Sequence, residues 1–354
     1  MMVVQSNAVG RHIKVKGAGI AGVVSCLPER QVNNDHFDAQ FGAPVVKDVI
    51  KMIGVENRYW TDERTSSRDL CLKAGQRLLQ QMEWLPSSVD AIIFVSQTPD
   101  YRLPASACVL QADLGLPSAC IAFDVNLGCS AYPYALFLGM TMVQTGAARR
   151  VLLAVGDTIS KLVDPTDRST AMLFGDAGTV TAIESVPGQS ACFILGTDGR
   201  GACNLIVPRG AYKDYSQSGD HRLMDKASDR LYMDGGEIFN FTLKAVPALI
   251  NETLDLSGIA AKDYDGFLLH QANMFMLKHL TKKANLPADK TPINIDQFGN
   301  TSSASIPLLM TTCLQDQLRN GSMQLGLFGF GVGYSWAGVS LAVGPLKCVE
   351  TIKC

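Results

Sequence analysis

The 354-residue sequence is poor in charge, and the few charges nearly cancel. Lysine and arginine together number 31, aspartate and glutamate 33, and only 18% of the residues are charged. This balance excludes nucleic-acid binding through a broadly basic surface, although it leaves room for a local basic patch. Low charge and a 47% apolar content also exclude extended disorder and predict a large buried core. The length predicts about two domains.

No C-x-x-C pair occurs among the ten cysteines, so zinc ribbons and dithiol redox motifs have no support. An even cysteine count invites a disulfide framework, but such frameworks belong to small secreted domains that cannot build their own core. Residues 1–17 lack a charged start followed by an apolar stretch, and no signal peptide is expected. We therefore expect a cytoplasmic protein with free thiols, in which one cysteine could carry out chemistry.

No uniformly apolar run is long enough to read as a membrane span. Residues 125–148 and 320–346 are long and uncharged, but the first contains Pro133 and three glycines, and the second contains seven glycines. Both are expected to be segments buried deep inside a protein without a membrane span. The sequence also lacks low-complexity tracts and linkers, so any two domains must pack closely.

Two parts of the chain resemble one another. Residues 90–98 resemble residues 265–273, and each segment follows an amphipathic helix candidate. Apolar runs typical of strands covered on both faces occur at 151–155, 179–183, 267–269 and 339–343. We expect a layered α/β fold made of a duplicated unit whose halves meet near residues 185–190. The alternative to duplication is that the two parts resemble one another only because any two α/β segments share such features.

Cys129 lies in the strongest candidate site. An apolar strand at 121–123 is followed by a turn containing Gly128 and then by an uncharged helix candidate ending near residue 148. Cys129 would lie at the N-terminal end of that helix, where unpaired N–H groups and the helix dipole favour a thiolate and can bind an oxyanion. The alternative interpretation is a buried structural cysteine.

His270 and Asn300 are the other two candidates. His270 directly follows a predicted strand, and Asn300 lies in a glycine-flanked loop before a helix expected at about 304–318. Alone, each could be a buried histidine or a turn asparagine. Together with Cys129 they indicate an activated thiol with two hydrogen-bonding partners. The glycine-rich segment 329–333 could offer backbone N–H groups to a ligand, or could simply form a tight turn.

The sequence resembles the β-ketoacyl-acyl-carrier-protein synthase III family of thiolase-like condensing enzymes. The resemblance runs in order from about residue 12 to 345, and its motifs are Gly128-Cys129-Ser130-Ala131, Asp164-Pro-Thr-Asp-Arg168, Phe174-Gly-Asp-Ala-Gly, His270-Gln-Ala-Asn, Gly299-Asn-Thr-Ser-Ser-Ala-Ser and Gly329-Phe-Gly-Val-Gly. It implies a five-layered αβαβα fold with an N-terminal half at 12–187 and a C-terminal half at 188–346.

The resemblance also implies an activity. Cys129 would be acylated by an acyl-CoA or an acyl-carrier protein, and malonyl-acyl-carrier protein would then lose CO₂ and attack the acyl group, as in fatty-acid initiation or a polyketide-type pathway. His270 and Asn300 would be the other catalytic residues, and no metal or cofactor is implied. The backbones of Cys129 and Val332 would form an oxyanion hole. The residues implied to bind substrate or carrier are Arg168, Phe174, Asn273, Lys282 and Leu103.

Leu103 occupies the position of a family residue that reaches into the partner's acyl pocket, which implies a homodimer. Other positions depart from the family pattern, because its coenzyme A contacts are replaced by Asp48, Met52, Gly236, Asn240 and Phe275. We therefore expect a specialised acyl donor in place of acetyl coenzyme A; delivery on a carrier protein is one hypothesis, and delivery by coenzyme A stays open.

Three other functions stay open at this point. Some relatives transfer the acyl group to an oxygen or nitrogen acceptor. A papain-like cysteine hydrolase also has its histidine 130–150 residues after its cysteine, and the separation of Cys129 and His270 is 141. A non-catalytic scaffold is the third, and the presence of all three site residues argues against it.

Overall fold

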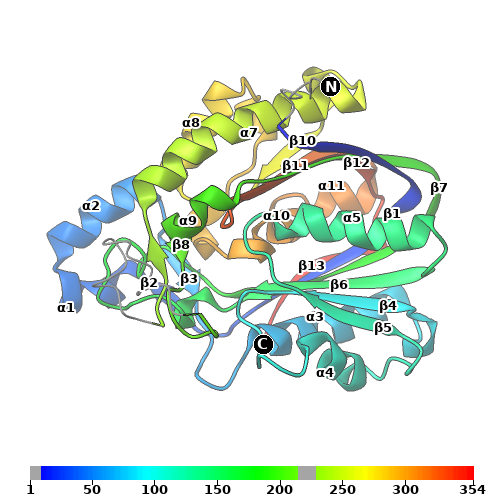
Figure 1. Ribbon diagram of the computed structural model, residues 1–354, viewed down its shortest axis with the longest axis horizontal. Helices are drawn as coiled ribbons and strands as arrows, with labels where there is room; N and C mark the ends of the chain where they lie inside the picture. Colours follow the sequence, from blue (N-terminus) through cyan, green and yellow to red (C-terminus); the bar gives the residue numbers. More distant parts are fainter. Residues whose placement is uncertain (1–8, 214–228) are drawn as a thin grey trace.

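The computed structural model describes residues 9–213 and 229–354 and arranges them in five layers, helix–sheet–helix–sheet–helix (Figure 1). The predicted α/β fold with five layers is confirmed. The strands are β1 (Arg11–Leu27), β2 (Gln31–Asn33), β3 (Asn57–Tyr59), β4 (Ala91–Val95), β5 (Ile121–Val125), β6 (Arg150–Asp157), β7 (Ala177–Thr197), β8 (Leu205–Ile206), β9 (Tyr232–Met233), β10 (Gly266–Leu269), β11 (Met323–Gly331), β12 (Ser335–Val343) and β13 (Cys348–Lys353). The α-helices are α1 (Asp38–Phe41), α2 (Ala43–Ile53), α3 (Ser67–Met82), α4 (Ser106–Asp113), α5 (Ala131–Gln144), α7 (Gly235–Ser257), α8 (Met274–Lys283), α9 (Ile295–Phe298), α10 (Ser305–Cys313) and α11 (Gln315–Asn320).

Two long strands, β1 and β7, run through both sheets. The first part of β7 pairs with β6, which continues through parallel β4 and β5, whereas its second part pairs with β12, followed by β11 and β10. Strand β1 lies antiparallel to β7 along both parts. The segment 185–190, where we expected the halves to meet, therefore lies inside one continuous strand. The strands predicted from the apolar runs all lie in this framework.

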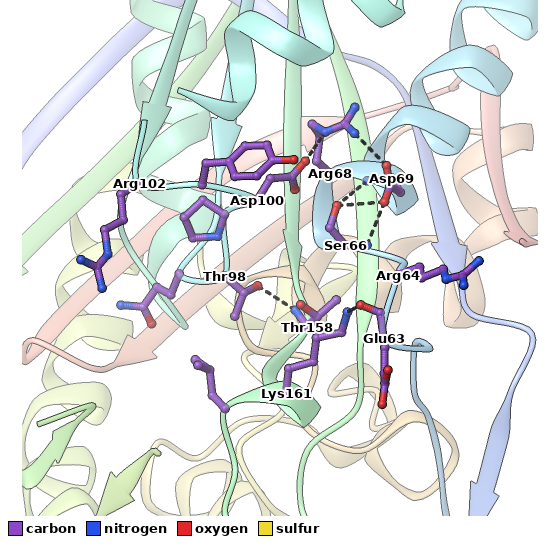
Figure 2. A pocket seen from close by; sticks show the side chains of 14 residues that line it. Glu63, Arg64, Ser66, Arg68, Asp69, Thr98, Asp100, Arg102, Thr158 and Lys161 are labelled. Carbon is purple, nitrogen blue, oxygen red and sulfur yellow. Dashed lines mark hydrogen bonds and ion pairs between the residues drawn. The ribbon is translucent and has the colours of Figure 1, made fainter. Parts of the chain in front are cut away.

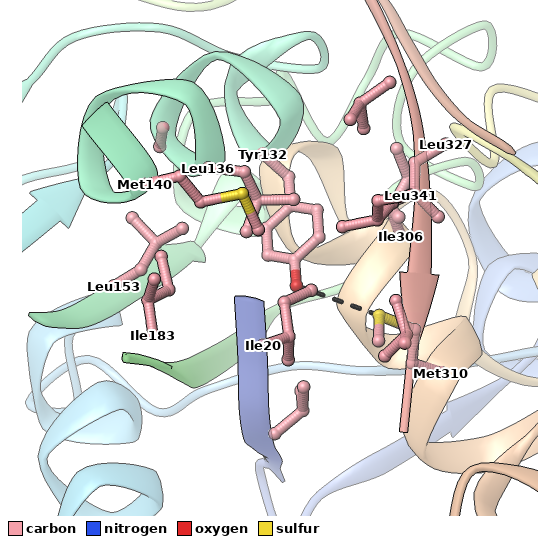
Figure 3. Close-up of a cluster of buried hydrophobic side chains, with 14 of the residues drawn as sticks. Ile20, Tyr132, Leu136, Met140, Leu153, Ile183, Ile306, Met310, Leu327 and Leu341 are labelled. Carbon is pink, nitrogen blue, oxygen red and sulfur yellow. Dashed lines mark hydrogen bonds between the residues drawn. The ribbon is translucent and has the colours of Figure 1, made fainter. Parts of the chain in front are cut away.

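Helices α5 and α10 form the middle layer between the two sheets (Figure 1). Figure 3 shows Tyr132 and Leu136 of α5 packed among side chains from both sheets and from Met310 of α10. A helix covered by sheets on both sides can be apolar all round, which explains why residues 125–148 resemble a membrane span. Among the described residues, no helix is long and apolar enough to cross a bilayer.

The outer layers are built from amphipathic helices. Helix α3 begins with the predicted cap, since Ser66 accepts a hydrogen bond from the Asp69 N–H and the Asp69 carboxylate accepts one from the Ser66 N–H. With α4 it covers the outer face of the first sheet, and α7 and α8 cover that of the second (Figure 1). The single helix expected at 304–318 was wrong, because Leu314 leaves helical geometry (φ −119°) and separates α10 from α11.

Cys26, near the end of β1, forms a disulfide with Cys354 at the other end of the chain. The expectation that all ten cysteines are thiols is therefore wrong for this pair. The other eight cysteines are free. Sequence spacing could not reveal the bond, because 328 residues separate the two partners, and only the pairing of β1 with β13 brings them together.

Cutting this disulfide should destabilise the fold. Removing a native disulfide costs about 2–5 kcal/mol of unfolding free energy, and we expect a loss of that size in urea unfolding of the Cys26→Ser/Cys354→Ser protein. Exposed Cys108 mutated to Ser is the control and should leave stability unchanged. Titration of the unreduced, unfolded protein should find eight thiols; a count of ten would contradict the bond.

Candidate active site

Cys129 lies between β5 and α5, as the sequence predicted. Ser130 caps α5 and Ala131 begins it, so the thiol lies just before the first helical turn. The side chain is half-buried. Gly331, at the end of β11, is required for this packing, because a Cβ there would lie 2.9 Å from the Cβ of Cys129.

The resting state of Cys129 is the thiol. Burial raises the pKa of Cys129 to about 12, and hydrogen bonds from the Ser302 hydroxyl and from the backbone N–H groups of Cys129 and Val332 oppose that shift. The expectation that the helix end would favour a thiolate was wrong in its net effect, because desolvation outweighs the nearby donors. The two N–H groups nevertheless point at the sulfur and could also donate to an oxyanion beside it.

His270 follows β10 directly and is almost completely buried. Its Nδ1 lies 2.8 Å from the Ser305 hydroxyl, and its ring meets Phe330 edge-on, with the centroids 5.5 Å apart. Burial lowers the pKa of His270 to about 3, so the ring is neutral at physiological pH. A neutral imidazole can donate one hydrogen bond but is a weak base.

Asn300 is fixed mainly by its own backbone. Its N–H donates to the Leu173 carbonyl over 2.9 Å, and its carbonyl accepts from Gly175. Its side-chain amide donates to the Ala272 carbonyl over 3.3 Å, which leaves the second amide hydrogen for a ligand. Ala272 lies two residues after His270, so this contact joins the two catalytic candidates.

Sequence reasoning missed the residue that joins all three candidates. The Ser302 hydroxyl lies 4.0 Å from the Cys129 sulfur, its N–H donates to the Asn300 side-chain oxygen over 2.9 Å, and its carbonyl lies 2.9 Å from the Ser305 hydroxyl beneath His270. Ser302 stood inside the quoted asparagine motif, but a serine carries no signal of its own there.

An apolar hollow of about 670 Å³ opens between α2, α7 and α8. Leu173, which accepts the Asn300 N–H, and Asn273, three residues after His270, belong to its wall. The family departures Asp48, Met52, Gly236 and Phe275 line the same hollow, together with Arg168. Asn240 is not part of the wall.

The remaining predicted residues lie elsewhere. Phe174 is buried and contributes a backbone bridge to Asn300. Lys282, in the last turn of α8, lines a separate hollow of about 400 Å³. Leu103 is 76% exposed on the surface. The structure therefore gathers Arg168 and Asn273 in one hollow, which none of the three catalytic candidates lines, and leaves Lys282 and Leu103 outside it.

A polar hollow of about 590 Å³ lies beside the Leu103 loop (Figure 2). Arg68 on its wall pairs with Asp69 and Asp100. These three charged groups of the wall are therefore paired with one another, and none of the three catalytic candidates lines this hollow.

Comparison with known protein families gives two matches. Residues 123–199 match the family described as 3-oxoacyl-[acyl-carrier-protein] synthase III, and residues 254–343 match the C-terminal family of the same enzymes. The first match contains Cys129, and the second contains His270 and Asn300.

Individual relatives agree over nearly the full length. The chain is 34% identical to a putative 3-oxoacyl-[acyl-carrier-protein] synthase 3 of Campylobacter jejuni, covering 92% of this chain and 93% of that protein. It is also 34% identical to β-ketoacyl-[acyl-carrier-protein] synthase III of Caldanaerobacter subterraneus, covering 90% and 96%. The crystal structure of a 3-oxoacyl-(acyl-carrier protein) synthase from Burkholderia xenovorans is 61% identical, with a TM-score of 0.96 over 98% of this chain and 99% of that one.

Proposed function

The chain belongs to the β-ketoacyl-[acyl-carrier-protein] synthase III family, and from this premise we propose how Cys129, His270 and Asn300 perform its condensation. The enzyme is an acyltransferase that joins an acyl group to malonyl-acyl-carrier protein with loss of CO₂, the initiating reaction of fatty-acid synthesis. The observation that carries the residue roles is the cluster around Ser302, which contacts the Cys129 and Asn300 side chains directly and His270 by way of Ser305. The papain-like alternative falls with the family assignment.

Acylation of Cys129 is the first half of the reaction. The sulfur attacks the carbonyl carbon of the acyl thioester, the bond from that carbon to the leaving sulfur breaks, and the cysteine proton goes to the leaving thiol. The N–H groups of Cys129 and Val332, which already point at the sulfur, would hold the oxyanion formed on the way. Loss of one such donor typically costs about 2.7–4 kcal/mol of transition-state stabilisation.

Condensation is the second half. When CO₂ leaves the malonyl thioester, negative charge collects on the thioester oxygen. The free amide hydrogen of Asn300 would donate to it, and so would the Nε2–H of His270, in the tautomer whose Nδ1 accepts from the Ser305 hydroxyl. Decarboxylation itself generates the carbon nucleophile, so no strong base is needed, which fits a histidine whose pKa burial lowers to about 3. The carbon then attacks the acyl carbonyl carbon, the bond from that carbon to the Cys129 sulfur breaks, and the departing thiolate takes up a proton from water to restore the thiol. This donor pair favours condensation over transfer to an oxygen or nitrogen acceptor.

Intact-mass spectrometry tests the first half. Incubation with an acyl donor should add one acyl group to the protein, and peptide mapping should place that group on Cys129. An acyl group on another residue, or none with any donor of a panel, would contradict the proposed role.

The acyl donor is the next question, and we propose a carrier-bound, specialised starter unit. The hollow bordered by Leu173, whose carbonyl accepts from Asn300, contains one acidic and one basic side chain, Asp48 and Arg168, among mostly apolar neighbours. Asp48 also pairs with Lys51 over 3.0 Å. Met52 and Phe275 are 58% and 45% exposed at this entrance. Such a wall offers only one cation, Arg168, to the several phosphates of coenzyme A, whereas the arm of a carrier-bound thioester has a single phosphate.

Replacing Phe275 by arginine should shift donor preference. One cation beside a phosphate is worth about 1 kcal/mol, so we expect KM for acyl-CoA to fall about fivefold in Phe275→Arg, with little change for acyl-carrier donors. Leu85→Arg, at another exposed apolar position, is the control. Efficient acylation of the unmodified enzyme by acetyl coenzyme A would end the proposal.

We also propose that the enzyme is a homodimer. Among the described strands, β5 is paired on one side by β4 and ends the sheet on its other side, an arrangement that proteins usually cover. Ile121 on β5 is 42% exposed. Tyr101 and Leu103, on the loop between β4 and α4, are 63% and 76% exposed. Ultracentrifugation should find a dimer whose affinity falls in Leu103→Lys; an active monomer would contradict this.

A cytoplasmic location is part of the proposal, since the acyl-carrier substrates would be met there. Disulfides are rare in that reducing compartment, so the bond between Cys26 and Cys354 makes the location testable. Acid-quenched alkylation of whole cells should leave this one pair unmodified. Alkylation at all ten cysteines would show that the bond does not persist in the cell.

A further inference from the structure

Asp157 is a buried carboxylate that the condensation leaves without a role. It ends β6 and is fully buried. Within residues 9–213 and 229–354 its hydrogen bonds come from neutral donors: the Gln97 N–H at 2.8 Å, the Ser96 hydroxyl at 3.2 Å, the Thr98 hydroxyl at 3.5 Å, the Ser303 N–H at 3.3 Å, the Ser303 hydroxyl at 2.6 Å and the Ser302 hydroxyl. A buried carboxylate of this kind is costly, so its position demands an explanation.

The two oxygens of Asp157 hold two different parts of the molecule. Oδ1 accepts from residues 96–98, which follow β4, and Oδ2 accepts from Ser303 in the loop after Asn300. Thr98 and Thr158, which flank this contact in the structure, lie in the polar hollow of Figure 2. The carboxylate therefore ties the first sheet to the loop that carries Asn300.

Ser302, next to the tied residue, has an unusual backbone. Its φ is +50°, a left-handed conformation that residues other than glycine rarely adopt. This conformation directs its N–H to Asn300 and its hydroxyl to the Cys129 sulfur. Such conformations persist where the surrounding structure fixes them, and the hydrogen bonds from Ser303 to Asp157 do so here.

We propose that Ser302, held in place by Asp157, is a positioning residue of the condensation reaction. Its hydroxyl lies between Asp157 and the Cys129 sulfur and donates to the thiolate when it forms, while its N–H orients Asn300. The proposal rests on the proposed function of Cys129. It adds two positioning residues, Ser302 and Asp157, to the three residues proposed to contact the substrates.

The electrostatic surroundings of the sulfur are simple. Asp157 is the charged group whose field reaches it, and that field raises the pKa of Cys129, whereas the Ser302 hydroxyl lowers it. His270, the other titratable neighbour across the site, is neutral. Asp157 thus raises the pKa of Cys129 and Ser302 lowers it, so substitutions at the two residues should change the reactivity of the thiol in opposite directions.

Ser302→Ala removes the hydroxyl and leaves the backbone contacts available. The readout is the rate of Cys129 alkylation by iodoacetamide as a function of pH, which needs no acyl substrate. A hydrogen bond to a charged group is strong enough for about one pKa unit, so the rate at a given pH should fall about tenfold. Ser25→Ala, which removes another buried hydroxyl bonded to Thr311, is the control. An unchanged rate in Ser302→Ala overturns the hydroxyl's role.

Asp157→Asn tests the anchor. An amide of equal size must turn its NH₂ toward either the Gln97 N–H or the Ser303 N–H, so one of the two attachments becomes repulsive. We expect condensation to fall by about tenfold or more, while Cys129 alkylation is at least as fast as in the unmodified enzyme because the negative charge is gone. Condensation at the unmodified rate overturns the anchoring role. Failure of Cys129 to acylate in the unmodified enzyme would instead contradict the proposed function.

Discussion

Cys129→Ala should lose condensation by at least about three orders of magnitude, because without the sulfur the acyl group has no covalent carrier. The same protein should still release CO₂ from malonyl-acyl-carrier protein, since His270 and Asn300, the proposed donors for the developing negative charge, are unchanged. Steady-state product formation and CO₂ release, measured on one preparation, check both halves.

Exposed Cys108→Ala is the matched control for this experiment, and it should behave as the unmodified enzyme does. Retention of condensation within tenfold in Cys129→Ala would refute the covalent mechanism. Loss of both condensation and CO₂ release would instead refute the proposal that CO₂ release depends on His270 and Asn300 and not on the Cys129 sulfur.

The reverse pattern is expected at the other two residues. His270→Ala or Asn300→Ala should lower condensation and CO₂ release by about 10²–10³-fold, the usual cost of one donor to a developing oxyanion, while Cys129 still becomes acylated. The double variant should be little worse than either single one if both donors hold the same oxygen. Intact-mass measurement of acylation on each variant provides the comparison.

The pH dependence gives His270 a separate test. Because burial lowers its pKa from 6.5 to about 3, CO₂ release by Cys129→Ala should show no protonation step near pH 6.5. Stability, by contrast, should depend on pH in this range. The unfolded chain takes up the histidine proton near pH 6.5 and the folded chain does not, so this histidine destabilises the fold as pH falls from about 6.5 toward 3. A step in CO₂ release near pH 6.5 that His270→Ala abolishes would show that the ring is not kept neutral.

Most of the architecture was determined by pattern. Continuous apolar runs placed the buried strands, and the spacing of Leu70 to Met82 placed α3 with its cap at Ser66. The family motifs then supplied the order of the layers. The same local reasoning failed at Leu314, where the single helix expected at about 304–318 is divided into two helices. It failed also at Cys26 and Cys354, because disulfide partners are chosen by proximity in space.

By itself the sequence determined that Cys129, His270 and Asn300 belong together, since each stands in a recognisable local motif at the end of a strand or in a glycine-flanked loop. Only the tertiary structure decided their chemical states. Burial, a property of the packed molecule, makes the thiol weakly acidic and keeps the imidazole neutral. The tertiary structure also decided which residues contact the three candidates. Asp157 and Ser302 lie 145 positions apart in the sequence, and their proposed roles arise from side-chain contacts that no local pattern encodes.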